Sequence, residues 1–304
     1  PSVGTKYQSE SDLLNGPGRL WRYWRSYQSG SVGAMFSESL GIGWQHSFNS
    51  HLQVGITSVT LYDFDGSIVP FGVQGGVWKS WTDESRTLTE SLDLQGVRSG
   101  WVVRDEHNTV RRYGPTGQLL MASTASGEQI LLAYSDGLTN SPLSGLLRGA
   151  DGVPIQPAVA LPAGKLTLVS DSFGRTLEFG YDEQLRLVVV TSGGGLIVHY
   201  GYGALGQLSN VVYSDGALVH DSRSYLYEEE NYPTALTGII DEANARYATF
   251  SYSSSGIATG TQHNVGTTSI ESFSIARSVW GVNGAQAVIT NPQGSQSTLS
   301  FTSV

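Results

Sequence analysis

Histidine side chains are the first residues in this sequence that could hold a metal or move a proton. The chain has six of them and no cysteine. His46 and His51 are five positions apart, which would place their side chains on opposite faces of a strand. No His-x-His or His-Glu-x-x-His pattern occurs, so the residues that usually hold a zinc ion are missing. We therefore interpret the histidines as structural or surface residues and predict no metal site.

Carboxylates could serve in calcium binding or in glycoside hydrolysis. The tract YEEENY at 227–232 gathers three of them, but calcium loops alternate their ligands around a glycine turn, and we interpret this tract as a solvated acidic loop. Glycoside hydrolysis needs two carboxyl groups about 5–9.5 Å apart in a cleft. The turn-like tracts offer many pairings of this kind and single out none. The acids considered are Asp63, Asp65, Asp105, Glu106, Asp182 and Asp241.

Nucleophile and phosphate-binding motifs are absent from the sequence. No Gly-x-Ser-x-Gly occurs, and the glycine tracts SGGGL and GIG lack the Lys-Ser/Thr that follows a phosphate loop. We predict no catalytic residue and no cofactor. Exposed aromatic rings could still stack on sugar rings, and Trp78, Trp81 and Trp101 are the candidates for that alternative. Aromatics at this density are more often core residues.

Composition limits the class of protein. Charged residues are only 14% of the 304 residues, whereas Gly numbers 38 and Tyr 15. The net charge of -9 argues against nucleic-acid binding, which needs clustered Lys and Arg. No apolar run approaches the length of a membrane span, so we predict no membrane insertion. The sequence begins at Pro1 with no visible signal peptide, and we expect the natural chain to continue beyond Val304.

The elements that would position these residues are short strands. Turn-like tracts rich in Gly, Asp and Ser recur along the chain, and the runs between them are rich in Val, Leu, Tyr, Phe and Thr. No sustained helical periodicity occurs. This predicts an all-β fold of repetitive β-hairpins wound as a spiralling, curved sheet. The expected organisation is a lead-in arm at 1–20, hairpin repeats at 21–137, an insertion loop or connector at 138–165, and a further repeat block at 166–304.

One sequence motif recurs with a spacing of 21 residues. Adding 21 to the positions of Gly174, Tyr181 and Leu187 gives Gly195, Tyr202 and Leu208. Each copy predicts a two-stranded unit that cannot bury its own apolar face and therefore stacks on its neighbours. Looser copies follow, because Tyr202, Tyr227 and Tyr252 fall 25 residues apart. We predict that these tyrosines plug the ends of the hairpins.

Several segments of the sequence resemble a known family of repeat proteins. GRTLEFGYDEQLRLVVV, which contains Arg175 and Asp182, resembles the Rhs/YD-repeat phrase G-R-x5-Y-D-x-x-G-R-L-x-x-V. NYPTALTGIIDEANARYATFSYSSSGI at 231–257, SLGIGWQHSFNSHL at 39–52 and GTKYQSESDL at 4–13 resemble other segments of Rhs cores, and NPQGSQSTLSF resembles a D-P-x-G repeat opener. The Asp of the YD pair is Gly203 in the second copy and Ser253 in the last.

The resemblance implies a scaffold without catalytic residues. Rhs/YD-repeat sheets form a β-shell that encapsulates a C-terminal toxin domain of the same longer chain, as in bacterial polymorphic toxins. It implies interbacterial competition as the setting, secretion-apparatus components as further partners, and a secreted or cell-surface location after delivery. Two alternatives stay open: a carbohydrate-binding or adhesive module with glycans as partners, and a glycosidase-like enzyme.

Overall fold

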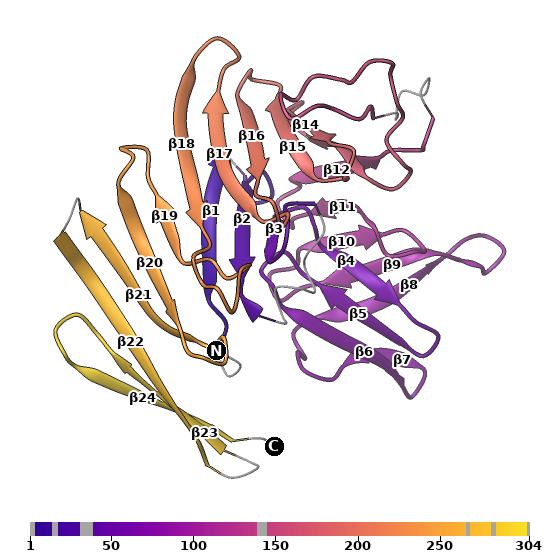
Figure 1. Cartoon of the computed structure of the whole chain (residues 1–304). Coiled ribbons are helices and arrows are strands. Elements are labelled where there is room, and N and C mark those ends of the chain that lie inside the picture. Colours follow the sequence, from indigo (N-terminus) through magenta and orange to yellow (C-terminus); the bar gives the residue numbers. More distant parts are fainter. Residues whose placement is uncertain are drawn as a thin grey trace. The chain divides into compact units, whose positions relative to one another are not determined.

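A computed structural model describes residues 4–13, 18–30, 39–138, 145–265, 268–280 and 284–302 (Figure 1). The elements are β-strands throughout. No helix among these residues has the length and apolar character needed to cross a membrane. The predicted all-β fold of repetitive hairpins is confirmed.

The strands form three sheets. The first is β1-β2-β3 and the second is β4-β5-β6-β7. The third contains β8 to β24 in chain order, with β8 and β24 at the two ends of the described pairings. The strands are β1 Tyr7–Leu13, β2 Tyr23–Gln28, β3 Trp44–His46, β4 His51–Val54, β5 Ser58–Tyr62, β6 Ile68–Gln74, β7 Val77–Ser80, β8 Thr87–Leu92, β9 Arg98–Arg104, β10 Val110–Tyr113, β11 Leu119–Ser123, β12 Gln129–Tyr134, β13 Leu166–Asp171, β14 Thr176–Tyr181, β15 Leu187–Ser192, β16 Ile197–Tyr202, β17 Leu208–Ser214, β18 Val219–Leu226, β19 Gly238–Ile240, β20 Arg246–Tyr252, β21 Ala258–Val265, β22 Thr268–Trp280, β23 Gly284–Thr290 and β24 Gln296–Thr302.

The chain divides into two compact units. One comprises residues Pro1–Gln8, Tyr27–Trp44 and Tyr200–Val304, and the other comprises Ser9–Ser26 and Gln45–His199. We call them the C-terminal unit and the central unit. Each has its own aromatic core.

Alternation along many of the strands places one face in the core. In β5 the side chains of Val59 and Leu61 are fully buried while their neighbours are half-buried. In the central unit, the ring of Phe179 lies edge-on to Tyr23 at 5.8 Å between centroids, and His46 packs 5.6 Å from Phe179. In the C-terminal unit the buried ring of Trp44 packs 4.8 Å from Tyr225. Burial of rings of this size is a main source of stability for short strands.

A single turn geometry joins most of the hairpins. The first residue donates its N–H to the carbonyl of the residue four positions later, and the fourth residue, which has positive φ, donates its N–H back to the first. This is a type I turn followed by a left-handed residue, one of the common short hairpin connections. Gly fits the left-handed position because it has no Cβ. The turns include 63–67, 93–97, 105–109, 114–118, 124–128, 171–175, 182–186, 192–196, 203–207, 241–245, 253–257 and 291–295.

The predicted insertion at 138–165 is only partly covered, because residues 139–144 lie outside the described residues. The described remainder folds back on β14. The N–H of Arg148 donates to the carbonyl of Tyr181 at 2.7 Å. The Arg148 side chain crosses Gly180, where a Cβ would come within 2.3 Å of Arg148 Cδ. Gly180 is therefore the position that lets this segment cover the strand.

The predicted lead-in arm at 1–20 contains β1, and its residues 1–3 and 14–17 lie outside the described part. Its last residues are held by Glu128, whose carboxylate accepts the backbone N–H groups of Arg19 at 2.8 Å and Leu20 at 3.1 Å. Trp21 N–H adds a third bond at 3.3 Å. Three donors on one buried carboxylate fix the path of this segment, which we call the strap (residues 18–22).

Candidate functional site

The repeat tyrosines are hairpin anchors. The hydroxyl of Tyr181, which is 2% exposed, donates to the carbonyl of Leu166 at 2.9 Å. Tyr252 makes the same bond to Leu236 at 2.7 Å. In each case the tyrosine ends one strand and its partner carbonyl lies 15 or 16 residues earlier. The ring fills the core while its hydroxyl satisfies a backbone acceptor that burial would otherwise leave unpaired.

Other copies of the repeat keep this bond or change its partner. Tyr134 donates to Leu119 at 2.7 Å and Tyr227 to Leu208 at 2.8 Å. Tyr202, which is half-buried, donates to the carbonyl of Ser39 at 3.1 Å. The two copies that the sequence singled out occupy equivalent places: Tyr181 and Tyr202 end β14 and β16, and the buried Leu187 and Leu208 begin β15 and β17.

The Asp of the YD pair caps the turn that follows the tyrosine. Asp182 Oδ1 accepts the N–H groups of Gln184 and Arg186 at 3.0 and 2.8 Å, and its Oδ2 accepts Arg186 Nε at 2.8 Å. Asp171 does the same with Phe173 and Arg175. Burial opposes ionisation of Asp171, but the hydrogen bonds from the Arg175 backbone and guanidinium outweigh it and lower its pKa.

Arg175 has a second role besides its bond to Asp171. Its guanidinium carbon lies 4.8 Å from the centre of the Trp21 ring and 5.5 Å from that of Phe173. Gly174, at φ 82°, and Gly195, at φ 91°, take the left-handed position of their turns. Leu185 takes the same position at φ 61°, where the family phrase has Gly.

The copy with Gly203 in place of Asp keeps the turn by a different route. Leu205 N–H donates to Gln207 Oε1 at 3.0 Å, so the Gln side chain supplies the acceptor that Asp supplies elsewhere. A Cβ at Gly203 would come within 2.7 Å of Gln207 Nε2. Gly114 and Gln118 show the same arrangement. In both turns the first residue is Gly and the fifth is Gln, because a side chain on the first residue would occupy the space that the Gln side chain fills.

The candidate sugar-stacking tryptophans divide by exposure. Trp101 is 1% exposed and lies between Arg98, 4.4 Å from its ring, and Trp78, 5.4 Å away. Its ring is therefore not accessible to a ligand, which corrects the alternative for this residue. Trp78 is half-buried and donates to Glu90 at 3.2 Å. Trp81 is 60% exposed and covers Gly72, which leaves it as the accessible ring of the three.

A polar pocket of about 550 Å³ lies in the central unit. The turn 63–67, the β7–β8 connection, the turn 105–109 and the strap surround it, and Phe48, Leu119, Ala122 and Ile130 supply buried apolar side chains. Of the six acids that could be paired in many ways on the sequence alone, the fold brings four to this pocket: Asp63, Asp65, Asp105 and Glu106. Asp182 and Asp241 do not line it.

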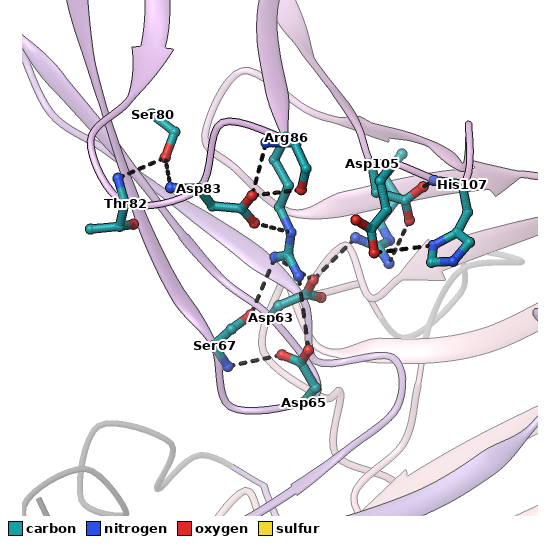
Figure 2. Close-up of polar contacts among 12 residues, drawn as sticks. Asp63, Asp65, Ser67, Ser80, Thr82, Asp83, Arg86, Asp105 and His107 are labelled. Carbon is teal, nitrogen blue, oxygen red and sulfur yellow. Dashed lines mark hydrogen bonds and ion pairs between the residues drawn. The ribbon is translucent and has the colours of Figure 1, made fainter. Parts of the chain in front are cut away.

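Asp63 is the centre of the charge cluster in the pocket, as Figure 2 shows. Its side chain is 1% exposed, and its Oδ2 accepts Arg86 Nη1 at 3.0 Å and Arg111 Nη1 at 3.1 Å. Arg86 also reaches Asp83 at 3.1 Å and Asp65 at 3.8 Å. Removing one partner from a buried carboxylate–guanidinium group costs stability, because the remaining buried charge loses its compensation.

Arg111 joins this cluster to the aromatic core beneath it. Burial opposes its charge, but the neighbouring carboxylates, Asp63 first among them, outweigh burial and raise its pKa. Its guanidinium carbon lies 4.9 Å from the centre of the Phe64 ring, and its Nη2 is 3.8 Å from Asp105. Phe64 in turn meets Trp24 edge-on at 5.7 Å.

The cluster does not have the form of an acid–base pair. Asp63 Oδ2 accepts hydrogen bonds from two guanidiniums and its Oδ1 accepts the N–H of Phe64. Asp105 Oδ1 accepts the N–H groups of His107 and Thr109. Within the residues described, no three His, Asp or Glu side chains are grouped to hold a metal ion. No sequence pattern signalled the Arg86 and Arg111 contacts, because the partners lie 23 and 48 residues from Asp63.

Comparison with known families decides how the repeats are classified. Residues 181–218 match the family described as RHS Repeat. The chain carries an RHS repeat. The matched segment begins at Tyr181, the anchored tyrosine. This match confirms the predicted Rhs/YD-repeat resemblance. Residues 1–71 match a second family, described as a domain of unknown function (DUF6531). The RHS repeat supports a scaffold role for the chain.

Curated proteins gave no match. Among solved structures, the chain is similar to "TcdB2-TccC3-TEV", at 11% identity with a TM-score of 0.29, and to "TcdB2-TccC3", at 9% with a TM-score of 0.30. The two matches cover 81% and 90% of this chain, but only 16% and 21% of the matched chains. A porin-like protein from Bacteroides uniformis matches at 9% identity and a TM-score of 0.34, over 83% of this chain and 92% of that one. Scores this low do not establish a shared fold.

Proposed function

We propose that this RHS-repeat chain is a structural wall that encloses or presents a C-terminal toxin or effector domain of a longer chain. The observation that carries the proposal is the tyrosine anchor. Each anchored hydroxyl ties the last residue of one strand to the backbone at or just before the start of the preceding strand, across the open end of the hairpin that the two strands form. Such ties brace the two strands of a hairpin at the end opposite their turn, as expected for a load-bearing repeat sheet.

The function needs no catalytic group in the wall. Its side chains are used for packing, turn capping and charge balance, as Tyr181, Asp182 and Asp63 illustrate. Interbacterial competition, a secretion apparatus as partner and a secreted or cell-surface location follow from the same family relationship and belong to this proposal. Extracellular delivery also suits a chain whose turns are short and repeatedly capped, because exposed loops are the usual sites of proteolysis.

Limited proteolysis of the full-length gene product tests the proposal. We expect a domain that follows residue 304 to be protected in the intact protein. Tyr181→Ala, which removes an anchor from the wall, should expose that domain to cleavage, whereas Tyr247→Phe, on an exposed ring, should not. Equal cleavage of that domain in all three proteins, or a natural product with no following domain, would contradict enclosure.

The carbohydrate alternative predicts a different result. Saturable glycan binding lost on mutation of Trp81, the accessible ring, would favour an adhesive module instead. A panel of neutral glycans titrated against the parent chain and Trp81→Ala distinguishes the two functions, since a wall needs no such binding.

A further inference from the structure

We propose that the polar pocket of the central unit binds an acidic sugar, meaning a hexuronate or a glycan end that carries one. This goes beyond the scaffold function, which requires no ligand at this place. Three features of the pocket carry the inference: two unpaired arginines, three partly open carboxylates and a half-buried tryptophan.

The arginines are Arg19 and Arg22 of the strap. Both are exposed and both line the pocket. Within the described residues neither guanidinium has a hydrogen bond or ion pair, in contrast to Arg86 and Arg111, which are held by Asp63. The Glu128 carboxylate fixes the backbone of the strap through its three hydrogen bonds. Two guanidiniums on a fixed backbone present the paired donors that a carboxylate accepts.

The carboxylates are Asp65, Asp83 and Glu106, with side chains 46%, 29% and 64% exposed. Their accessible oxygens can accept hydrogen bonds from ligand hydroxyls. They also exclude whole classes of ligand. A phosphate-rich ligand would be repelled by three carboxylates, and a polycation would be repelled by Arg19 and Arg22. A hydroxyl-rich ligand whose only charge is a single carboxylate satisfies both sets of groups.

Trp24 supplies the apolar surface for the carbon face of a sugar ring. It is half-buried, lines the pocket and is supported edge-on by Phe64. Its backbone is held by Ser47, whose N–H donates to the Trp24 carbonyl at 2.9 Å. A volume of about 550 Å³ falls within the size range of small-ligand sites. Room, a ring platform and oriented polar groups therefore occur together.

Calorimetric titration of the 304-residue chain with methyl glucuronide, methyl glucoside and inorganic phosphate tests the proposal. We expect saturable binding of the glucuronide and at least about tenfold weaker binding of the glucoside, because losing a charge-assisted pair costs about 1.4 kcal/mol or more. The double variant Arg19→Ala/Arg22→Ala should lose this preference while keeping the parent's melting temperature. Arg112→Ala, an exposed arginine outside the pocket, is the matched control and should bind as the parent does.

Other outcomes would overturn the proposal. Glucuronide and glucoside binding of equal strength would remove the role of the arginines, and phosphate binding as tight as glucuronide binding would indicate an unselective anion site. No saturable binding of the glucuronide would remove the site altogether. Trp24→Phe provides a second check that does not depend on charge: it should weaken both sugars by a similar factor and leave phosphate unaffected.

Discussion

The hydroxyl of Tyr181 donates a 2.9 Å hydrogen bond to the carbonyl of Leu166, 15 residues earlier in the chain. The ring is buried among the side chains of the central unit, so one residue contributes both apolar burial and a long-range backbone tie. The two contributions can be separated by substitution.

Tyr181→Ala should lower the free energy of unfolding by about 3–5 kcal/mol, as truncations of buried aromatics do. Tyr181→Phe keeps the ring and leaves the Leu166 carbonyl without its donor, so we expect a loss of about 1–2 kcal/mol. Urea unfolding followed by circular dichroism measures both. Tyr247→Phe is the control, because Tyr247 is 37% exposed. A Tyr181→Ala protein as stable as the parent would contradict the anchoring role.

Leu185→Gly should stabilise the protein by about 0.5–1 kcal/mol, because Leu185 is held at φ 61°, where a side chain is strained and Gly is not. The reverse change, Gly174→Ala at φ 82°, should destabilise by about 1 kcal/mol, and no atom lies within 4 Å of the added Cβ to confuse the result. Glu183→Ala, exposed in the same turn as Leu185, is the control. Thermal melts giving the same sign for both changes would refute the turn assignment.

Asp63→Asn should cost about 3 kcal/mol or more, because it removes the shared charge from two guanidiniums and leaves Arg111 buried without its nearest carboxylate. Asp65→Asn, whose side chain is 46% exposed and 3.8 Å from Arg86, should cost less than about 1 kcal/mol. Chemical denaturation of both variants gives the comparison. Similar losses for the two would mean that Asp63 is not the centre of the cluster.

His46 predicts a specific loss of stability in acid. Burial lowers its pKa from 6.5 to about 3, so between these values the unfolded chain takes up a proton that the folded chain does not. Stability from this group is complete above the unfolded pKa and decreases as the pH falls below it, by about 2 kcal/mol at pH 5.

His46→Phe isolates this contribution. Its stability relative to the parent should be constant above about pH 7.5 and should rise by about 2 kcal/mol towards pH 5. Unfolding curves across that range measure the difference, and the high-pH plateau serves as the baseline for the lost ring contacts. A difference that does not change with pH would mean that the His46 site admits the charged form.

Local signals in the sequence predicted the hairpins well. The left-handed turn positions at Gly174 and Gly195 follow from Gly in a short polar tract, and Leu187 and Leu208 are buried where the alternation puts them. The replacement of Asp by Gly203 removes the carboxylate that caps the turn in the first copy. It is a compensated exchange, because Gln207 supplies the missing acceptor.

The contents of the pocket could not be predicted in this way. Strands β6 and β7 separate Asp63 from Arg86 in the chain, and the β8–β9 hairpin separates Arg86 from Arg111. Nothing in their spacing pairs them. The burial of Trp101 was equally invisible, because strand alternation does not say which face Trp78 and Arg98 will cover.

The sequence by itself determined the all-β class, the hairpin turns and the repeat of aromatic strand ends, since each depends on φ preferences and alternation within a few residues. Only the tertiary structure decided which carbonyl each tyrosine reaches, which carboxylates share a guanidinium and which arginines remain unpaired at the pocket. Those contacts join residues far apart in the chain, and their partners are selected by packing and by the balance of buried charge.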